Sequence, residues 1–182
     1  MPIAPTRRPA LSWTCALVLF LCVAVGFAEA DEQRPLPAEV VGRYGLDLVP
    51  YTTVRRSDGT YRRMLTQPTT LAALAAGGPP PEGARILMET YYSPGRVSTV
   101  FHMEKRQGRW RYGSFPAAAP DLATRPQASC LSCHAGAADR DLVFTLPSLR
   151  AVAAGGAVSD FTCARGGRSP CDAETYRRGA AP

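Results

Sequence analysis

The chain has 182 residues, which is enough for one domain with a sizeable core. Its formal net charge is +6 at pH 7, from 21 Lys and Arg residues against 15 Asp and Glu residues. The basic residues are spread along the chain without forming a block, so nucleic acid is not an expected partner. Lys105 is the only lysine, and chemistry that needs an amine side chain therefore has one candidate.

The N-terminus has the pattern of an export signal. Arg7 and Arg8 precede an uncharged apolar run over residues 11–27, and a small-x-small cleavage sequence ends at Ala30. We therefore expect a signal peptide over residues 1–30, a periplasmic location and no membrane span in the mature chain. The alternative is a segment that stays uncleaved as an anchor.

The next part of the chain predicts short strands and one helix. Residues 31–40 are expected to be a flexible lead-in, and Ser57-Asp58-Gly59 favours a turn between two strands. A short helix is expected over residues 69–76, because Pro68 precedes it and two glycines follow it.

A three-stranded antiparallel meander is predicted over residues 86–92, 97–105 and 110–115, joined by turns at Pro94-Gly95 and Gln107-Gly108. In the second of these strands the period of two places Phe101, Met103 and Lys105 on one face. His102 belongs to the opposite face. In the third strand, Trp110 and Tyr112 share a face.

The run Cys130-Leu131-Ser132-Cys133-His134 matches the C-x-x-C-H pattern of c-type haem attachment. In that chemistry the two thiols add to the vinyl groups of the haem, and the histidine binds the iron as its proximal ligand. We therefore expect one haem c, attached through Cys130 and Cys133, with His134 on the iron. A zinc site is disfavoured, because Cys163 and Cys171 are too far apart for a second close-spaced pair.

The remaining cysteines agree with an oxidising compartment. Cleavage after the signal would remove Cys15 and Cys22, and the haem would take two more of the six cysteines. Cys163 and Cys171 are left and are expected to form a disulfide.

The segment after the haem run is mostly apolar at first and Gly- and Arg-rich later. A helix is expected to begin at Pro147 and reach Ala154. The overall expectation is an α+β, β-rich fold, in which an antiparallel sheet and a few short helices carry the haem. Residues 41–154 would form the haem domain, and residues 155–182 a tail held by the disulfide.

Several segments together resemble the cytochrome P-460 and cytochrome c′-beta family over residues 40–154. They are Pro81-Glu82-Gly83 before a strand, the aromatic Trp110-Arg111-Tyr112 strand, the haem run, and Asp141-Leu142-Val143-Phe144-Thr145 after it. The resemblance implies a mainly antiparallel sheet with a few helices, in a protein that is often a homodimer.

The family implies two activities. P-460-type members carry a lysine cross-linked to the haem and oxidise hydroxylamine; the matching position here is Met88, and the assisting acid would fall near Phe101. Members of the c′-beta type lack the cross-link and bind nitric oxide in an apolar distal pocket. Because a thioether cannot form the cross-link, the resemblance favours the second type.

The sixth position of the iron has four candidate neighbours, namely Met88, Phe101, His102 and Met103. Either methionine would bind the iron through sulfur and make the protein an electron carrier, or both pack in the pocket wall. Phe101 either caps the iron or fills the core. A strand histidine such as His102 is more often a surface residue, or a residue behind the ligands, than a ligand itself. Lys105 is expected to be solvated.

The sequence thus predicts a periplasmic monohaem c-type cytochrome that binds a small diatomic such as nitric oxide and meets a periplasmic redox partner. The alternatives are an electron carrier with Met88 or Met103 on the iron, and a hydroxylamine-oxidising enzyme. These residues leave open whether the protein is an enzyme.

Overall fold

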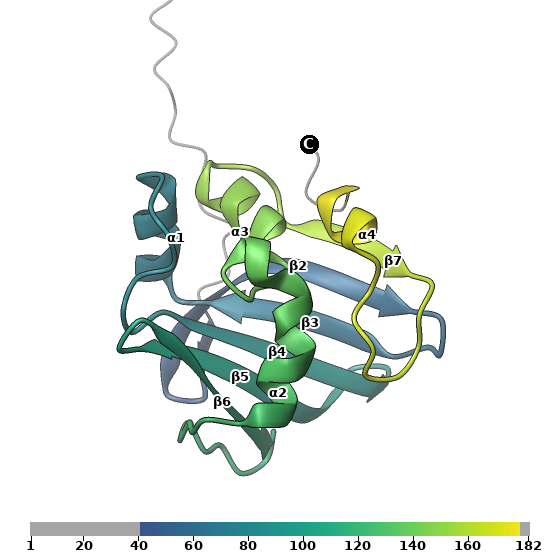
Figure 1. Ribbon diagram of the computed structural model, residues 1–182. Helices are drawn as coiled ribbons and strands as arrows, with labels where there is room; N and C mark the ends of the chain where they lie inside the picture. The colour runs from purple at the N-terminus through teal and green to yellow at the C-terminus, as the bar shows by residue number, and fades with distance from the viewer. Residues whose placement is uncertain (1–40, 179–182) are drawn as a thin grey trace, which may run out of the picture. The chain divides into compact units, whose positions relative to one another are not determined.

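A computed structural model describes residues 41–178 (Figure 1). The predicted signal peptide, the lead-in over residues 31–40 and the last four residues of the chain lie outside this range. Within it, no helix combines the length and the apolar character that a membrane crossing needs.

The centre of the structure is one seven-stranded sheet, in which six strands lie in chain order and the seventh is added at β2. The strands are β1 (Val41–Arg43), β2 (Leu46–Arg56), β3 (Tyr61–Thr66), β4 (Arg85–Ser93), β5 (Arg96–Arg106), β6 (Arg109–Pro116) and β7 (Ser159–Cys163). All pairs from β1 to β6 are antiparallel. Strand β7 pairs in parallel with the second half of β2, whereas β1 pairs with its first residues.

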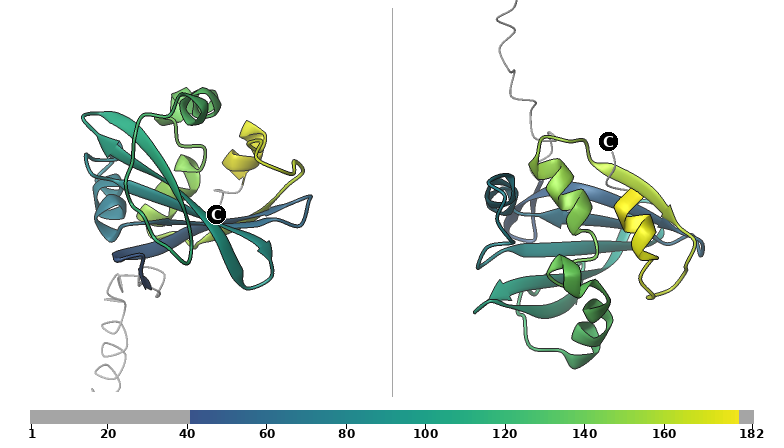
Figure 2. Two further views of the ribbon diagram at one scale, coloured as in Figure 1. Left: turned by 90° about the horizontal axis from the view of Figure 1, so that it is seen from below. Right: turned by 45° about the horizontal axis from the view of Figure 1, so that its top comes forward.

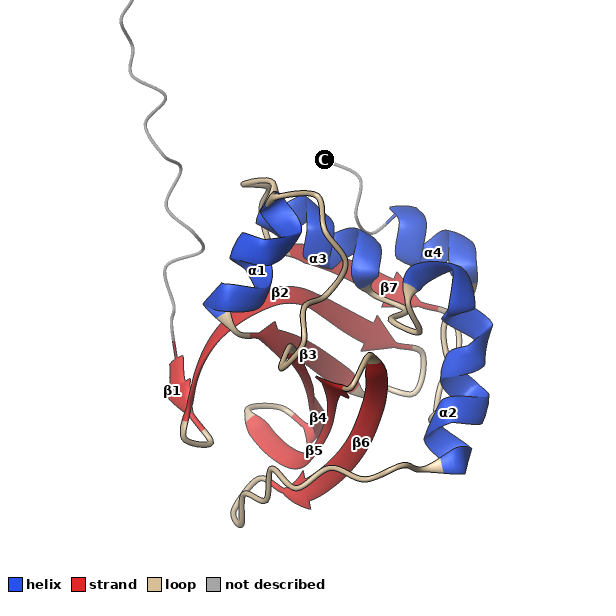
Figure 3. Ribbon diagram, turned by 60° about the vertical axis from the view of Figure 1, so that its left-hand side comes forward, coloured by secondary structure: helices blue, strands red, loops and turns tan. Residues whose placement is uncertain are grey.

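Five helical segments accompany the sheet. They are α1 (Pro68–Ala75), α2 (Ala128–His134), the 3₁₀ helix η1 (Ala135–Arg140), α3 (Leu146–Ala153) and α4 (Ala173–Arg178). Helices α2, α3 and α4 lie on the same face of the sheet (Figures 1 and 2). Strands β4 to β6 curl toward this face, so α2 stands across from them (Figure 3).

The predicted β-rich α+β fold and its meander are confirmed. The three expected strands are β4, β5 and β6, and their ends differ from the prediction by one residue. The turn at Gln107-Gly108 has φ angles of 53° and 69° at these residues. Two successive positive φ angles belong to the tight hairpin turn whose twist matches that of paired strands.

Alternation along the strands gives the sheet two apolar faces. One face packs against the helices and contains Tyr51, Met64, Ile86, Met103, Trp110, Tyr112, Leu149 and Val152. The other face contains a smaller cluster of Leu48, Leu65, Leu87, Val100 and Phe115. Residues that are adjacent in sequence therefore pack in different cores, as Met64 and Leu65 do in β3 and Ile86 and Leu87 do in β4.

The segment expected to be a tail is part of the same compact unit as the sheet. Its strand β7 extends the sheet at β2, and Tyr176 of α4 is buried in the helix-side core. A disulfide joins Cys163, at the end of β7, to Cys171. The sequence did not indicate this packing, because a five-residue strand that pairs with a segment a hundred positions earlier has no local signature.

Replacing both Cys163 and Cys171 with alanine should lower the free energy of unfolding by about 2.5 kcal/mol, because the unfolded chain regains the entropy of a short open loop. Urea unfolding of the double variant and of the wild type measures the difference. Wild-type protein unfolded with a reductant present should match the double variant. Equal stability of all three samples would show that the bridge does not stabilise the fold.

Candidate functional site

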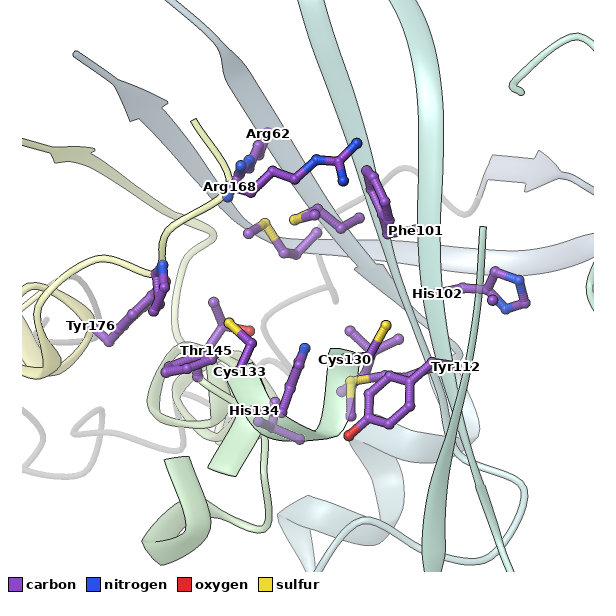
Figure 4. A pocket seen from close by; sticks show the side chains of 18 residues that line it. Arg62, Phe101, His102, Tyr112, Cys130, Cys133, His134, Thr145, Arg168 and Tyr176 are labelled. Carbon is purple, nitrogen blue, oxygen red and sulfur yellow. The ribbon is translucent and has the colours of Figure 1, made fainter. Parts of the chain in front are cut away.

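A cavity of about 190 Å³ lies between α2 and the helix-facing side of the sheet (Figure 4). The residues of the C-x-x-C-H run that carry the expected chemistry, Cys130, Cys133 and His134, all line it. The other walls are mostly apolar and come from β3, β4, β5 and β6, from the segment after η1, from the segment between β7 and α4, and from α4 itself.

Helix α2 brings both thiols to the cavity. Cys130 and Cys133 are one turn apart, so their side chains share a face of the helix. Both are free thiols, and the Cys130 Sγ donates to Gln127 Oε1 at 3.1 Å. Leu131, between them in sequence, points away and is 47% exposed. The run therefore presents two sulfur atoms and an imidazole to one space.

The His134 ring is held in a defined orientation. Its Nδ1 lies 2.6 Å from the Leu142 carbonyl oxygen, and the rings of Tyr112 and Phe144 lie 5.2 and 5.5 Å away. A carbonyl can only accept, so Nδ1 carries the proton and Nε2 keeps its lone pair. A ring nitrogen of His134 points into the cavity (Figure 4), and with Nδ1 engaged this is Nε2. Burial lowers the pKa of His134, which keeps the imidazole neutral.

The Leu142 carbonyl is placed by an unusual turn after η1. Asp141 and Leu142 both have left-handed backbone angles, with φ of 51° and 63°. Non-glycine residues adopt this conformation at some cost, so other contacts must hold it. Trp110 Nε1 donates to the Asp141 carbonyl oxygen at 2.7 Å, and Lys105 Nζ donates to both Asp141 carboxylate oxygens at 2.7 and 2.6 Å.

The expectation that Lys105 is solvated was wrong. Its side chain is 11% exposed, and its ammonium group lies 5.4 Å from the centre of the Trp110 ring in addition to the Asp141 contact. The last residues of β5 pack beside Trp110, and this packing covers the lysine stem. Lys105 is engaged with the turn at Asp141 and is not among the residues that line the cavity.

The sheet wall contains the predicted distal candidates. Met88, Phe101 and Met103 line the cavity, and Phe101 lies across it from His134 (Figure 4). His102 borders the cavity, but its ring points away from it, next to Phe115. The opposite faces predicted for Phe101 and His102 are thus observed. The His102 side chain is buried.

Further residues line the cavity that the sequence had not singled out as site residues. They are Arg62, Met64, Ile86, Tyr112, Gly113, Val143, Phe144, Thr145, Arg168, Pro170 and Tyr176. For Tyr112 there was a signal in the sequence, because its alternation placed Tyr112 and Trp110 on one face of their strand. Thr145 ends the segment used for the family resemblance, and its hydroxyl lies 2.8 Å from that of Tyr51. For Arg62 and Arg168 a single sequence carries no signal.

The site fits a haem attached through thioether bonds. Two thiols, a neutral imidazole with a free lone pair and an apolar space are the donor set and the environment that such a group requires. The carbonyl partner of His134 Nδ1 matches the rule that a metal-binding histidine donates its other N–H to a fixed acceptor.

Fold and donor set are those of a haem cytochrome. The sequence profile of the family described as Cytochrome P460 matches residues 44–145, which is more than half of the chain. The chain therefore belongs to the cytochrome P460 family, whose members are haem-iron proteins and are generally exported. No curated protein matches the sequence. The match ends at Thr145, so α3, β7 and α4 lie beyond it.

The substitution Asp141→Asn tests the anchor of the Leu142 turn. It leaves the Lys105 ammonium group without a carboxylate in a largely covered place, and we expect the free energy of unfolding to fall by about 2 kcal/mol. The control Asp160→Asn breaks the exposed ion pair with Arg55 and should change stability by less than about 0.5 kcal/mol. Urea unfolding gives both values. Equal effects of the two substitutions would mean that the Lys105 pair does not hold the turn.

Proposed function

We propose that this protein is a periplasmic monohaem c-type cytochrome that binds a small neutral diatomic ligand, with nitric oxide as the best candidate. The haem is attached through Cys130 and Cys133, and His134 Nε2 is the proximal ligand of the iron. The observation that carries the proposal is the position of the His134 ring, which directs Nε2 into a cavity whose opposite wall is apolar.

The composition of the wall supports a neutral ligand. Phe101, Met88, Met64 and Ile86 contribute apolar surface, no carboxylate of residues 41–178 lines the cavity, and its cationic side chains are Arg62 and Arg168 on the side away from the C-x-x-C-H run. When bound, the haem would supply an iron that can take a small ligand. His134 would hold this iron through Nε2, and the apolar side chains of the sheet wall would keep water away from it. A neutral gas enters such a space without losing strong hydration, whereas an ion beside the apolar wall loses much of its hydration.

Hydroxylamine oxidation through a lysine cross-link is not supported by the same wall. Met88 lines the cavity at the position where the family resemblance expects the lysine, and Lys105 is bound to Asp141. Phe101 lies where the resemblance expects the assisting acid. The wall thus lacks an amine for the cross-link and a carboxylate to accept a proton.

An electron carrier is the second candidate, and it is favoured by the thioethers on the sheet side of the cavity. Met88 and Met103 both line the space, and a methionine bound to iron would close the sixth position. We place this alternative second because Met103 is packed in the helix-side core and Met88 packs against it, so both sulfur atoms already have apolar neighbours.

The absorption spectrum of the purified ferrous protein, recorded with and without nitric oxide, separates the two candidates. The proposal predicts a five-coordinate high-spin spectrum that changes on addition of the gas. A sharp low-spin spectrum that does not respond to the gas would contradict it and favour the carrier. A green protein with a strongly red-shifted Soret band would indicate a cross-link and overturn the assignment of Lys105 to Asp141.

The methionine variants Met88→Leu and Met103→Leu give a second test at nearly constant side-chain volume. If both methionines are wall residues, the ferrous spectrum of each variant should match that of the wild type. Conversion of a low-spin to a high-spin spectrum in one variant would identify that methionine as an iron ligand. The variant in which alanine replaces Cys130 and Cys133 should lose all covalent haem, and covalent pigment retained in it would overturn the attachment.

A further inference from the structure

Two arginines lie on the side of the cavity away from the C-x-x-C-H run. Arg62 comes from β3, and Arg168 comes from the segment between β7 and α4. Figure 4 shows their side chains together on one side of the cavity, with Cys130, Cys133 and His134 on the other. They are the only cationic side chains, within the described part of the chain, that line this otherwise apolar space, apart from the two histidine rings.

Neither guanidinium group has a carboxylate partner within residues 41–178. Arg62 donates through one terminal nitrogen to the Gly167 carbonyl at 2.6 Å, and its Nε is buried without any hydrogen-bond partner. Burial is the main cause that lowers the pKa of Arg62, and the positive charge of Arg56 adds to it. A half-buried cation beside another cation is costly unless an anion joins it.

The loop that carries Arg168 is fixed by a disulfide and by several hydrogen bonds. The disulfide closes the segment between Cys163 and Cys171. Arg56, at the end of β2, donates to two carbonyls of that loop, those of Gly166 and Ser169, at 2.9 and 2.6 Å. Gly167, next to Arg168, is held from both sides: its N–H donates to the Asp58 carboxylate at 2.6 Å, and its carbonyl accepts from Arg62.

The hydrogen bonds to the loop thus come from β2, from β3 and from the turn between them. The Asp58 carboxylate accepts hydrogen bonds from the backbone N–H groups of Gly167 and Thr60, which lower its pKa to about 2. The loop is fixed by contacts on its backbone, and the side chain of Arg168 remains available to a ligand in the cavity.

The haem itself supplies anions at this place. Its two vinyl groups and its two propionate groups lie on opposite edges of the porphyrin ring. If the vinyl edge is bonded to Cys130 and Cys133, the propionate edge is directed to the far side of the cavity, where Arg62 and Arg168 lie. Guanidinium groups bind carboxylates with two parallel hydrogen bonds, which suits Arg better than Lys for this task.

We infer that Arg62 and Arg168 form a carboxylate-binding site that pairs with the haem propionates and that the disulfide-closed loop exists to place Arg168 there. The inference rests on the proposed haem attachment. It gives a role to the part of the chain after Thr145, which the family profile does not cover. A free oxyanion that enters the cavity offers the same chemistry, and the experiment below separates the two sources.

The test is the reduction potential of the haem, measured by spectroelectrochemistry between pH 5 and 9 on full-length protein. In Arg62→Gln or Arg168→Gln, a propionate charge is no longer neutralised and stabilises ferric iron. We expect the ferric-to-ferrous equilibrium to shift about threefold to tenfold toward ferric, where tenfold corresponds to about 59 mV for one electron. The propionate pKa should also rise, so the potential of these variants should become dependent on pH.

Two controls accompany the glutamine variants. Arg109→Gln removes one exposed positive charge that does not line the cavity, and it should leave both the potential and its pH dependence as in the wild type. Arg62→Lys and Arg168→Lys keep the charge and should recover most of the shift. If a glutamine variant does not fold, the lysine variant of the same position is compared with the wild type instead. Loss of the paired hydrogen bonds alone should shift the reduction potential by a smaller amount in the same direction.

The outcomes are distinct. Covalent haem together with an unchanged potential in both glutamine variants would overturn the arginine inference alone. A potential that shifts only when nitrate or acetate is added would assign the arginines to a free anion and equally overturn it. A wild-type protein without covalent haem would overturn the proposed function, and with it this inference. A uniform shift without pH dependence would mean that the arginines act at a distance and do not bind the propionates.

Discussion

The hydrogen bond between His134 Nδ1 and the Leu142 carbonyl is the constraint on which the site depends. It fixes the tautomer of the ring and the direction of Nε2, and so determines where an iron atom must lie. The carbonyl occupies its place because two residues with left-handed backbone angles turn the chain there. Lys105, near the end of β5, and Trp110, opposite it near the start of β6, hold that turn. The sheet thus orients the imidazole through a short chain of polar contacts.

The same sheet supplies the wall of the cavity that lies across from His134. Its helix-facing side chains are apolar and come from neighbouring strands in register, with Met88 opposite Phe101 across the β4–β5 pair. Polar groups are kept to the periphery: the Lys105 pair behind the proximal side and the two arginines across the cavity from the attachment run. In the proposed haem-loaded protein, the apolar wall would favour neutral ligands, and the two arginines would pair with the propionate edge of the haem. The apolar wall follows from the alternation along the strands, which decides which side chains face the helices and which face the smaller core on the other side of the sheet.

The sequence was most informative where the signal is local. The turn at Gln107-Gly108 and the alternation in β5 that separates Phe101 from His102 were readable and agree with the structure. The C-x-x-C-H run pointed to three residues that line one cavity. Long-range pairing was not readable. Lys105 looked solvated because its partner, Asp141, follows 36 positions later, and the segment after Gly155 looked like a tail because β7 pairs with β2 across more than a hundred residues. Arg62 and Arg168 come to the same cavity from β3 and from the loop after β7, which are far apart in the sequence.

The central claim is that the iron is held by His134 and is open toward the wall that contains Phe101. A crystal structure of the haem-loaded ferrous protein tests it most directly. The account predicts thioether bonds from Cys130 and Cys133, His134 Nε2 on the iron with Nδ1 still bonded to the Leu142 carbonyl, and no protein ligand on the other face. A structure in which Met88 or Met103 occupies the sixth position, or in which a residue other than His134 binds the iron, would contradict it.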